Sequence, residues 1–226
     1  DVKDLSSNLS SSVYSSWSSN SSCGSLNDDL LGWSANAVPH RVVANLAYRI
    51  EYARNFATTV SLFYQGSHNG RISYIYGGDV NGDGLAMDLM YIPRDESEIT
   101  FTDLIFTDKA TGNQTFIATA EDQSRAFFDY VDSVPYLRSR KGQYVERFGG
   151  LTQWLNMFDV KIVQDIFTGF GTDDRYTLQL SLDILNVGNL LNSNWGCYYA
   201  SRSYTYKNQT LLNVASVGST SSAPAF

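Results

Sequence analysis

The sequence has few charged residues and no long apolar run. Charged residues make up 17 % of the 226 residues, whereas about a quarter is usual in soluble domains. The 16 basic residues are outnumbered by 23 acidic ones, and no basic run is interleaved with aromatic residues. This balance excludes a nucleic-acid-binding surface. No apolar run reaches the roughly 18 residues of a transmembrane helix, although β-strands that span a membrane would leave no such run.

Residues that carry catalysis are also scarce. The chain has only two histidines, His40 and His68, and no Gly-x-Ser-x-Gly motif of an activated serine. Acidic residues such as Asp159 and Asp165 are better explained as members of a polar strand face than as a catalytic pair. We therefore expect no enzymatic activity.

Two pairs of long segments alternate between apolar and polar residues. In chain order they are RVVANLAYRIEY (41–52), FATTVSLFYQ (56–65), FDVKIVQDI (158–166) and YTLQLSLDI (176–184). Alternation with a period of two residues is typical of β-strands. We therefore predict two hairpins, over 38–66 and 154–186, with short turns at 53–55 and 168–174.

The remaining segments have a different composition. Residues 5–22 are rich in serine without periodicity, which favours an exposed loop over a strand. The insert at 67–153 contains two short strand patterns, at 71–76 and 89–93. It also contains a predicted helix at 119–134, with Thr119 as its N-cap and acidic residues in its first turn.

The predicted strands indicate an antiparallel transmembrane β-barrel segment. Their length of about ten residues exceeds the usual five or six and matches a tilted membrane strand. Tyr48, Tyr52, Phe56 and Tyr176 lie on the apolar faces near the short turns, and Tyr64 and Phe158 lie near the opposite ends. Aromatic girdles of this kind flank the apolar band of an outer-membrane barrel. The opposite faces carry charges suited to a watery lumen: Arg49, Glu51, Asp159, Lys161, Asp165 and Asp183. The alternative is a soluble two-sheet domain with charged outer faces.

Loop lengths predict the orientation of the barrel segment. Short turns of such barrels face the periplasm and long loops face outward. The outward parts would be the Ser-rich loop at 1–37, the insert at 67–153 and the end of the chain at 187–226. Cys23 and Cys197 then both lie outside, so a disulfide between them and two unpaired thiols remain open alternatives. The basic residues of 137–147 would also lie outside, in reach of lipopolysaccharide phosphate or an acidic substrate. The alternative is a solvated or salt-bridged loop.

The stretch GDVNGDG (78–84) begins like the calcium loop of an EF-hand. Position 12 of such a loop requires a bidentate Glu, but this chain has Met90 there, and a strand pattern precedes the loop in place of a helix. An EF-hand is therefore excluded. Either the loop is a structural Ca²⁺ clamp or it is a turn stabilised by Asx and Gly residues. The clamp would use four candidate ligands: Asp79, Asn81, Asp83 and Asp88.

The hairpins and the stretch DILNVGNLLNSNWG (183–196) resemble the C-terminal part of Oar-like TonB-dependent outer-membrane receptors. The resemblance covers about residues 38–197. These receptors occur in Bacteroidota and usually carry a carboxypeptidase-regulatory-like N-terminal domain. The resemblance implies a place in a barrel of 22 strands around a plug, in the outer membrane of a Gram-negative bacterium. No plug, TonB box or final barrel strand is present, so we expect the chain to be a portion of a larger receptor.

The resemblance also implies a function and partners. The chain would supply barrel wall and extracellular loops for TonB-energised nutrient uptake. Its partners would be the plug and remaining strands, TonB, lipid or lipopolysaccharide, and a surface lipoprotein. From 183–196 we expect a fold over the rim, anchored by Leu190, Leu191 and Trp195. The alternative function is a secreted, calcium-stabilised β-sandwich adhesin or glycan-binding module.

Overall fold

The computed structural model describes residues 3–4, 12–25, 31–108, 111–169, 175–197 and 207–214. The chain divides into two compact units. Unit 1 comprises Asp1–Ala37, Gly70–Leu151 and Ala200–Phe226, and unit 2 comprises Val38–Asn69 and Thr152–Tyr199. Antiparallel β-sheet is the main regular structure, as the sequence predicts, and helices are few. None of the helices in the described ranges is long and apolar enough to span a membrane.

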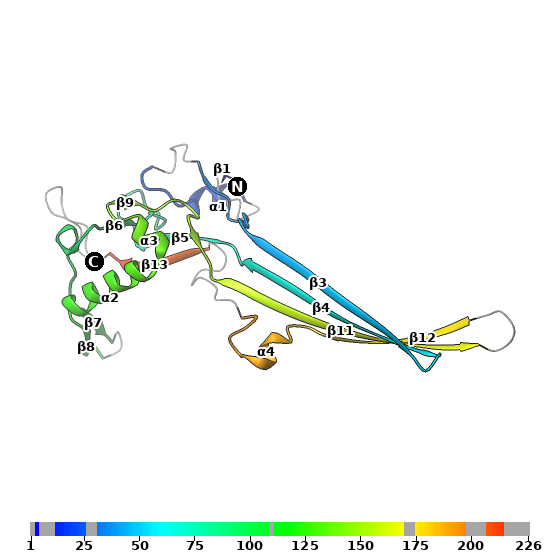
Figure 1. The fold of residues 1–226 in the computed structure, drawn as a ribbon. Helices are drawn as coiled ribbons and strands as arrows, with labels where there is room; N and C mark the ends of the chain where they lie inside the picture. Colours follow the sequence, from blue (N-terminus) through cyan, green and yellow to red (C-terminus); the bar gives the residue numbers. More distant parts are fainter. Residues whose placement is uncertain are drawn as a thin grey trace. The chain divides into compact units, whose positions relative to one another are not determined.

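The described part of unit 2 is one four-stranded antiparallel sheet with a short helix (Figure 1). Its elements are β3 (Arg41–Tyr52), β4 (Phe56–His68), β11 (Trp154–Gly169), β12 (Arg175–Ile184) and α4 (Gly188–Leu191). The strand order is β12-β11-β4-β3, so the two predicted hairpins are present and pair through β4 and β11. Positive φ angles at Ala53 (49°) and Arg54 (59°) close the first hairpin in a tight turn that suits the strand twist. The second predicted turn, 168–174, begins later than expected, because Thr168 and Gly169 continue strand β11 and pair with β12, and residues 170–174 lie outside the described residues.

The register places residues of one parity from all four strands on the same face. Leu46 pairs with Leu62, Leu62 with Val160, and Val160 with Ile184. A slip of one residue would exchange the two faces of a strand, so this register keeps every apolar set together. The predicted parity of each strand is therefore confirmed.

Unit 1 is built from short strands and helices drawn from distant parts of the sequence (Figure 1). A three-stranded sheet has the order β10-β5-β13, in which β13 runs parallel to β5. The strands are β1 (Lys3–Asp4), β2 (Gly32–Trp33), β5 (Arg71–Gly77), β6 (Tyr91–Ile92), β7 (Leu104–Thr107), β8 (Gln114–Ala118), β9 (Gln143–Tyr144), β10 (Gly150–Leu151) and β13 (Asn208–Asn213). The helices are α1 (Val13–Ser18), the 3-10 helix η1 (Glu96–Glu98), α2 (Ala120–Ser133) and α3 (Pro135–Ser139).

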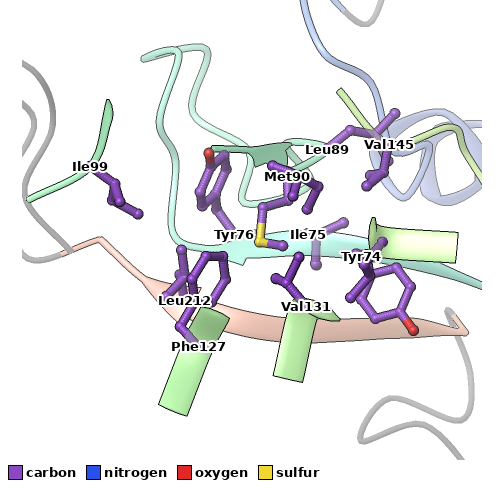
Figure 2. Packing of buried hydrophobic residues seen from close by; sticks show 12 residues of the cluster. Tyr74, Ile75, Tyr76, Leu89, Met90, Ile99, Phe127, Val131, Val145 and Leu212 are labelled. Atoms are coloured by element: carbon purple, nitrogen blue, oxygen red, sulfur yellow. The ribbon is translucent and has the colours of Figure 1, made fainter. Parts of the chain in front are cut away.

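The core of unit 1 lies between β5, α2 and β13. Helix α2 is the predicted helix, and the Thr119 side chain accepts a hydrogen bond from the Asp122 N–H, as an N-cap does. The helix buries Phe127 and Val131 against β5 and Leu212, and Figure 2 shows Met90 among these side chains. Unit 1 therefore has a hydrophobic core of its own, to which both the insert and β13 contribute.

The serine-rich segment corrects the prediction of an exposed loop. Residues 13–18 form α1, and Ser19, Asn20, Ser21 and Ser22 are buried. Backbone hydrogen bonds join Ser22 to Met87 and Leu89 (3.3 and 2.7 Å), and the Ser21 hydroxyl donates to Asn208. Polar residues are buried here because distant segments satisfy their hydrogen bonds, a condition that composition does not reveal.

Candidate functional site

One face of the unit 2 sheet is a continuous apolar surface. Its side chains are large, and Leu46 (70 % exposed) and Leu180 (56 %) are typical of them. The apolar surface is formed by Val42, Leu46, Tyr48, Ile50, Tyr52, Phe56, Val60, Leu62, Tyr176, Leu178, Leu180 and Leu182. Scattered apolar residues are normal on a protein surface, but a contiguous patch marks an interaction with protein or membrane.

The polar groups on the apolar surface bond to one another. The Gln164 amide oxygen accepts hydrogen bonds from the hydroxyls of Tyr52 (2.9 Å) and Thr58 (2.6 Å). The Gln164 amide nitrogen donates to the backbone carbonyl of Ala57 (3.2 Å). These internal bonds lower the cost of placing Thr and Gln in an apolar environment, where water is absent.

Aromatic rings lie at both ends of the apolar surface. At the turn end, the rings of Tyr52 and Phe56 stack with centroids 5.8 Å apart. At the other end, the rings of Tyr64 and Phe158 lie 4.8 Å apart. The Tyr64 hydroxyl donates to the Asn156 side chain (2.8 Å), so polar groups accompany the rings there. The predicted aromatic ends are therefore present, although Tyr48 lies further from the turn, in the row of Val60.

The opposite face of the sheet carries paired charges. Arg49 Nη1 lies 2.8 Å from Asp165 Oδ2, and the Gln179 amide donates to Asp165 Oδ1 (2.9 Å). Lys161 Nζ lies 3.2 Å from Asp183 Oδ1. Asp165 is thus held by a cation and an amide, which supports a structural role over a catalytic carboxylate pair. All the charges predicted for this face share it.

The segment after β12 turns back onto the sheet, but not on all of its predicted anchors. Asn186 adopts a positive φ of 53°, and the Val187 N–H donates to the Phe158 carbonyl (2.7 Å). The Trp195 ring lies 6.1 Å from the Phe158 ring, as an anchor should. Leu190 and Leu191 are about four-fifths exposed (79 % and 81 %), so the prediction that they anchor the fold was wrong.

In unit 1, Asp79 organises the loop that resembles a calcium site. Its Oδ1 accepts hydrogen bonds from the N–H groups of Gly82 (2.7 Å) and Asp83 (3.2 Å), and its Oδ2 accepts one from Gly84 (2.7 Å). Gly82 and Gly84 have φ angles of 78° and 89°, which favour glycine. These bonds are those of an Asx-stabilised turn.

The side-chain amide of Asn81 lies between the candidate calcium ligands. Its nitrogen donates to Asp88 Oδ1 (2.7 Å), Asp83 Oδ2 (3.3 Å) and the Gly24 carbonyl (3.2 Å). Carboxylate and carbonyl oxygens are suitable Ca²⁺ ligands, but an ion among them would require Asn81 to turn its own oxygen inward. Across the described residues, no three His, Cys, Asp or Glu side chains are grouped to hold a metal. Calcium binding by Asp79, Asn81, Asp83 and Asp88 stays a prediction.

A pocket of about 240 Å³ lies beside this loop. Its wall includes the side chains of Tyr76, Tyr91, Tyr144, Asp88 and Glu98, together with Asn81. Asn81 and Asp88 are candidate calcium ligands from the sequence, and Cys23, a candidate for the disulfide, also lines the pocket. The tyrosines come from β5, β6 and β9, and no motif links these three strands.

Burial and hydrogen bonding perturb the ionisable groups of the pocket. Burial raises the pKa of Asp88, although hydrogen bonds from Val80 and Asn81 oppose the shift. Burial also raises the pKa of Tyr76 to about 12. The pKa of Tyr91 is raised mainly by burial and secondly by the hydrogen bond to Glu98. The phenols of Tyr76 and Tyr91 therefore stay neutral over the physiological pH range.

A larger groove of about 630 Å³ lies elsewhere in unit 1. It is lined by residues of 101–105, α2 and β13, among them Phe127 and Tyr130. The adjacent hairpin β7–β8 exposes apolar side chains, including Phe106 and Phe116. No candidate from the sequence lines this groove.

Three of the four basic residues of 137–147 are engaged within unit 1: Arg140, Lys141 and Arg147. Arg140 pairs with Glu146 (2.6 Å), and Lys141 pairs with Asp132 (2.6 Å). Arg147 is buried and donates to Asn20. These contacts support the salt-bridged alternative for this segment over a phosphate-binding surface.

The histidines and cysteines show no catalytic arrangement in the described residues. His68 Nδ1 is hydrogen-bonded to the Thr152 carbonyl (2.7 Å), and His40 is exposed. Cys23 and Cys197 are exposed free thiols that belong to different units, and the Cys197 thiol donates to the Ser193 carbonyl (3.2 Å). Pairing of the two cysteines stays a prediction.

Comparisons of the chain with known protein families, curated proteins and solved structures found no match.

Proposed function

We propose that the chain forms wall and outward loops of a β-barrel in the outer membrane of a Gram-negative bacterium. The observation that carries this proposal is the exposed apolar surface of unit 2, opposite a face of paired charges. Water on the apolar side would be unfavourable by roughly 25 cal/mol for each Å² of apolar surface. Lipid on that side and water on the other satisfy both faces.

The spacing of the aromatic ends supports a membrane of ordinary thickness. Phe56 and Tyr64 are eight residues apart, and Phe158 is ten residues from Thr168, which pairs with Tyr176. At about 3.4 Å per residue, these spans are roughly 27 and 34 Å along the strands. A tilt of about 40° reduces them to roughly 21 and 26 Å, close to the apolar band of about 25 Å in outer-membrane barrels.

The tilt itself agrees with the positions of the aromatic residues. Phe56 pairs with Ile166 of β11, whereas Tyr176 pairs with Thr168 of the same strand. The aromatic position on β12 is therefore two residues closer to the turn end than the one on β4. This offset is about 6.8 Å along the strands, and β4 and β12 are two strand spacings of about 4.8 Å apart. The line that joins the two aromatic residues is therefore inclined by about 35° to the perpendicular of the strands. Strands of such barrels tilt by about 35–45°.

We further propose that the barrel belongs to a TonB-dependent receptor that imports a nutrient. This part rests on the resemblance of residues 38–197 to such receptors. The plug, the remaining strands and TonB would be its partners, and no catalytic step is involved. Strands β3 and β12 each form an edge of the four-stranded sheet. Lipid does not tolerate unpaired edges, so further strands must complete the wall.

The alternative, a secreted β-sandwich, has less support. A sandwich covers its apolar face with a second sheet at about 10 Å. The described part of unit 2 contains one sheet and the short helix α4.

Flotation with lipid vesicles tests the membrane proposal. We expect the full chain to float with the vesicles, to resist extraction by high salt and carbonate, and to dissolve on addition of detergent. A chain that stays in the aqueous fraction as a folded monomer would contradict the proposal. Binding of the complete receptor to the C-terminal domain of TonB separately tests the proposal that TonB drives nutrient uptake.

A further inference from the structure

We propose that the pocket lined by Tyr76, Tyr91 and Tyr144 binds an ammonium cation. The ligand class is a quaternary amine, which is permanently charged, or a protonated primary amine. Its source is either a lysine side chain of a peptide or a small free amine. This inference goes beyond the proposed transport function and does not depend on membrane insertion, because the pocket lies within unit 1.

The charge of the pocket favours a cation. Two carboxylates, Asp88 and Glu98, line it, and no Lys or Arg side chain does. The adjoining loop adds the carboxylates of Asp79 and Asp83. Arg94 is the nearby base, but its side chain is exposed and lies 3.9 Å from Glu98. Apart from the ion pair of Glu98 with Arg94, an anionic ligand would meet carboxylates alone, whereas a cation would be attracted.

The tyrosine rings supply a second attraction for the same charge. The rings of Tyr91 and Tyr144 lie 5.4 Å apart at 65° to each other, so their faces differ in direction. Tyr76 adds a third ring in the pocket wall. Aromatic rings attract cations through their electron-rich faces, and several rings together recognise ammonium groups.

The carboxylates are held in place before a ligand arrives. Glu98 Oε2 accepts hydrogen bonds from the Tyr91 hydroxyl (3.2 Å) and the Arg94 N–H (2.9 Å). Asp88 Oδ2 accepts one from the Val80 N–H (2.7 Å). Fixed partners reduce the entropy lost on binding.

The size of the pocket fits the head of one amine. Its volume of about 240 Å³ is below the roughly 300–1,000 Å³ of pockets that enclose drug-sized ligands. A trimethylammonium group or the end of a lysine side chain needs no more room.

Titration calorimetry on the full chain tests the inference with four probes. These are choline, its uncharged isostere 3,3-dimethylbutan-1-ol, N-acetyl-lysine methylamide, and glucose. We expect a cationic probe to bind at least tenfold more tightly than the isostere. Tighter binding of choline than of the lysine derivative would indicate that the ligand is a small free amine. Tighter binding of the lysine derivative would indicate that it is a lysine side chain of a peptide.

Two variants and a matched control locate the binding. Tyr144→Leu and Glu98→Gln should each weaken the cationic probe by about tenfold, whereas Tyr130→Leu, a similarly exposed tyrosine that lines the other groove, should leave it unchanged. Equal binding of the isostere, binding of glucose alone, no binding of any probe, or an equal loss in Tyr130→Leu would overturn the inference. Because the Tyr144 side chain is half exposed, that variant should fold even if Glu98→Gln does not.

Discussion

Replacing Leu180 with arginine would place a charge on the apolar surface of the sheet. In the proposed membrane, Leu180→Arg should lower the free energy of unfolding, because the guanidinium must enter the apolar layer or distort the strand to avoid it. The neighbouring residue Ser181 lies on the opposite, polar face. Ser181→Arg is therefore a control that adds the same side chain at nearly the same depth.

The expected magnitude follows from the position of Leu180. It is four residues from Tyr176, and its partner Gln164 is six residues from Phe158. With about 3.4 Å per residue and a tilt of about 40°, Leu180 lies roughly 10 Å from one aromatic end and 16 Å from the other. That depth is near the midplane, where arginine on the lipid face costs about 2–4 kcal/mol. Ser181→Arg should change the free energy by no more than about 0.5 kcal/mol.

Urea unfolding in lipid vesicles, followed by tryptophan fluorescence, measures both variants. The account requires a clearly lower midpoint for Leu180→Arg at an unchanged denaturant slope. Equal stabilities of the two variants would refute the reasoning, because they would mean that the two faces meet the same environment.

Three further predictions concern unit 1. Asn81→Asp replaces the amide that separates the candidate ligands with a carboxylate. Ca²⁺ should therefore protect the loop near residue 80 from proteolysis more strongly than in the unchanged chain. Equal cleavage of this variant with and without Ca²⁺ would refute the hypothesis of a Ca²⁺ clamp. Burial raises the pKa of Tyr76 to about 12. The neutral phenol therefore stabilises the folded state below pH 10, and this stabilisation is lost as the pH rises through about 12. The free energy of unfolding of Tyr76→Phe should fall less steeply with pH over that interval, and a fall identical to that of the unchanged chain would contradict the assignment. Thr119→Ala removes the cap of α2 and should cost about 1 kcal/mol, measured by urea unfolding, whereas Thr115→Ala, on the exposed strand β8, should cost less.

The long strands were predictable because their pattern is local. Alternation along β3 and β12 determines which side chains share a face, and the register of the sheet follows once those faces are matched. Helix α2 was predictable for the same reason, since Thr119 and the first-turn acids lie next to the residues they stabilise.

Unit 1 depends on contacts between distant segments. The buried Ser21 bonds to Asn208 and the buried Ser22 to Leu89, so serine composition gave the wrong environment for this stretch. The tyrosine pocket has the same origin, because Tyr76 and Tyr144 come from strands separated by α2. Leu190 and Leu191 show the converse error, since apolar residues in a short helix need not face the protein.

The most direct test of the account measures what touches each face of the unit 2 sheet. With Cys23 and Cys197 replaced by serine, Leu180→Cys and Ser181→Cys are labelled with an environment-sensitive fluorophore in vesicles that contain brominated lipids. The account predicts strong quenching of the label at residue 180 and weak quenching at residue 181. Equal quenching at both positions, or none at residue 180, would contradict the claim that the apolar side of this sheet lies against lipid.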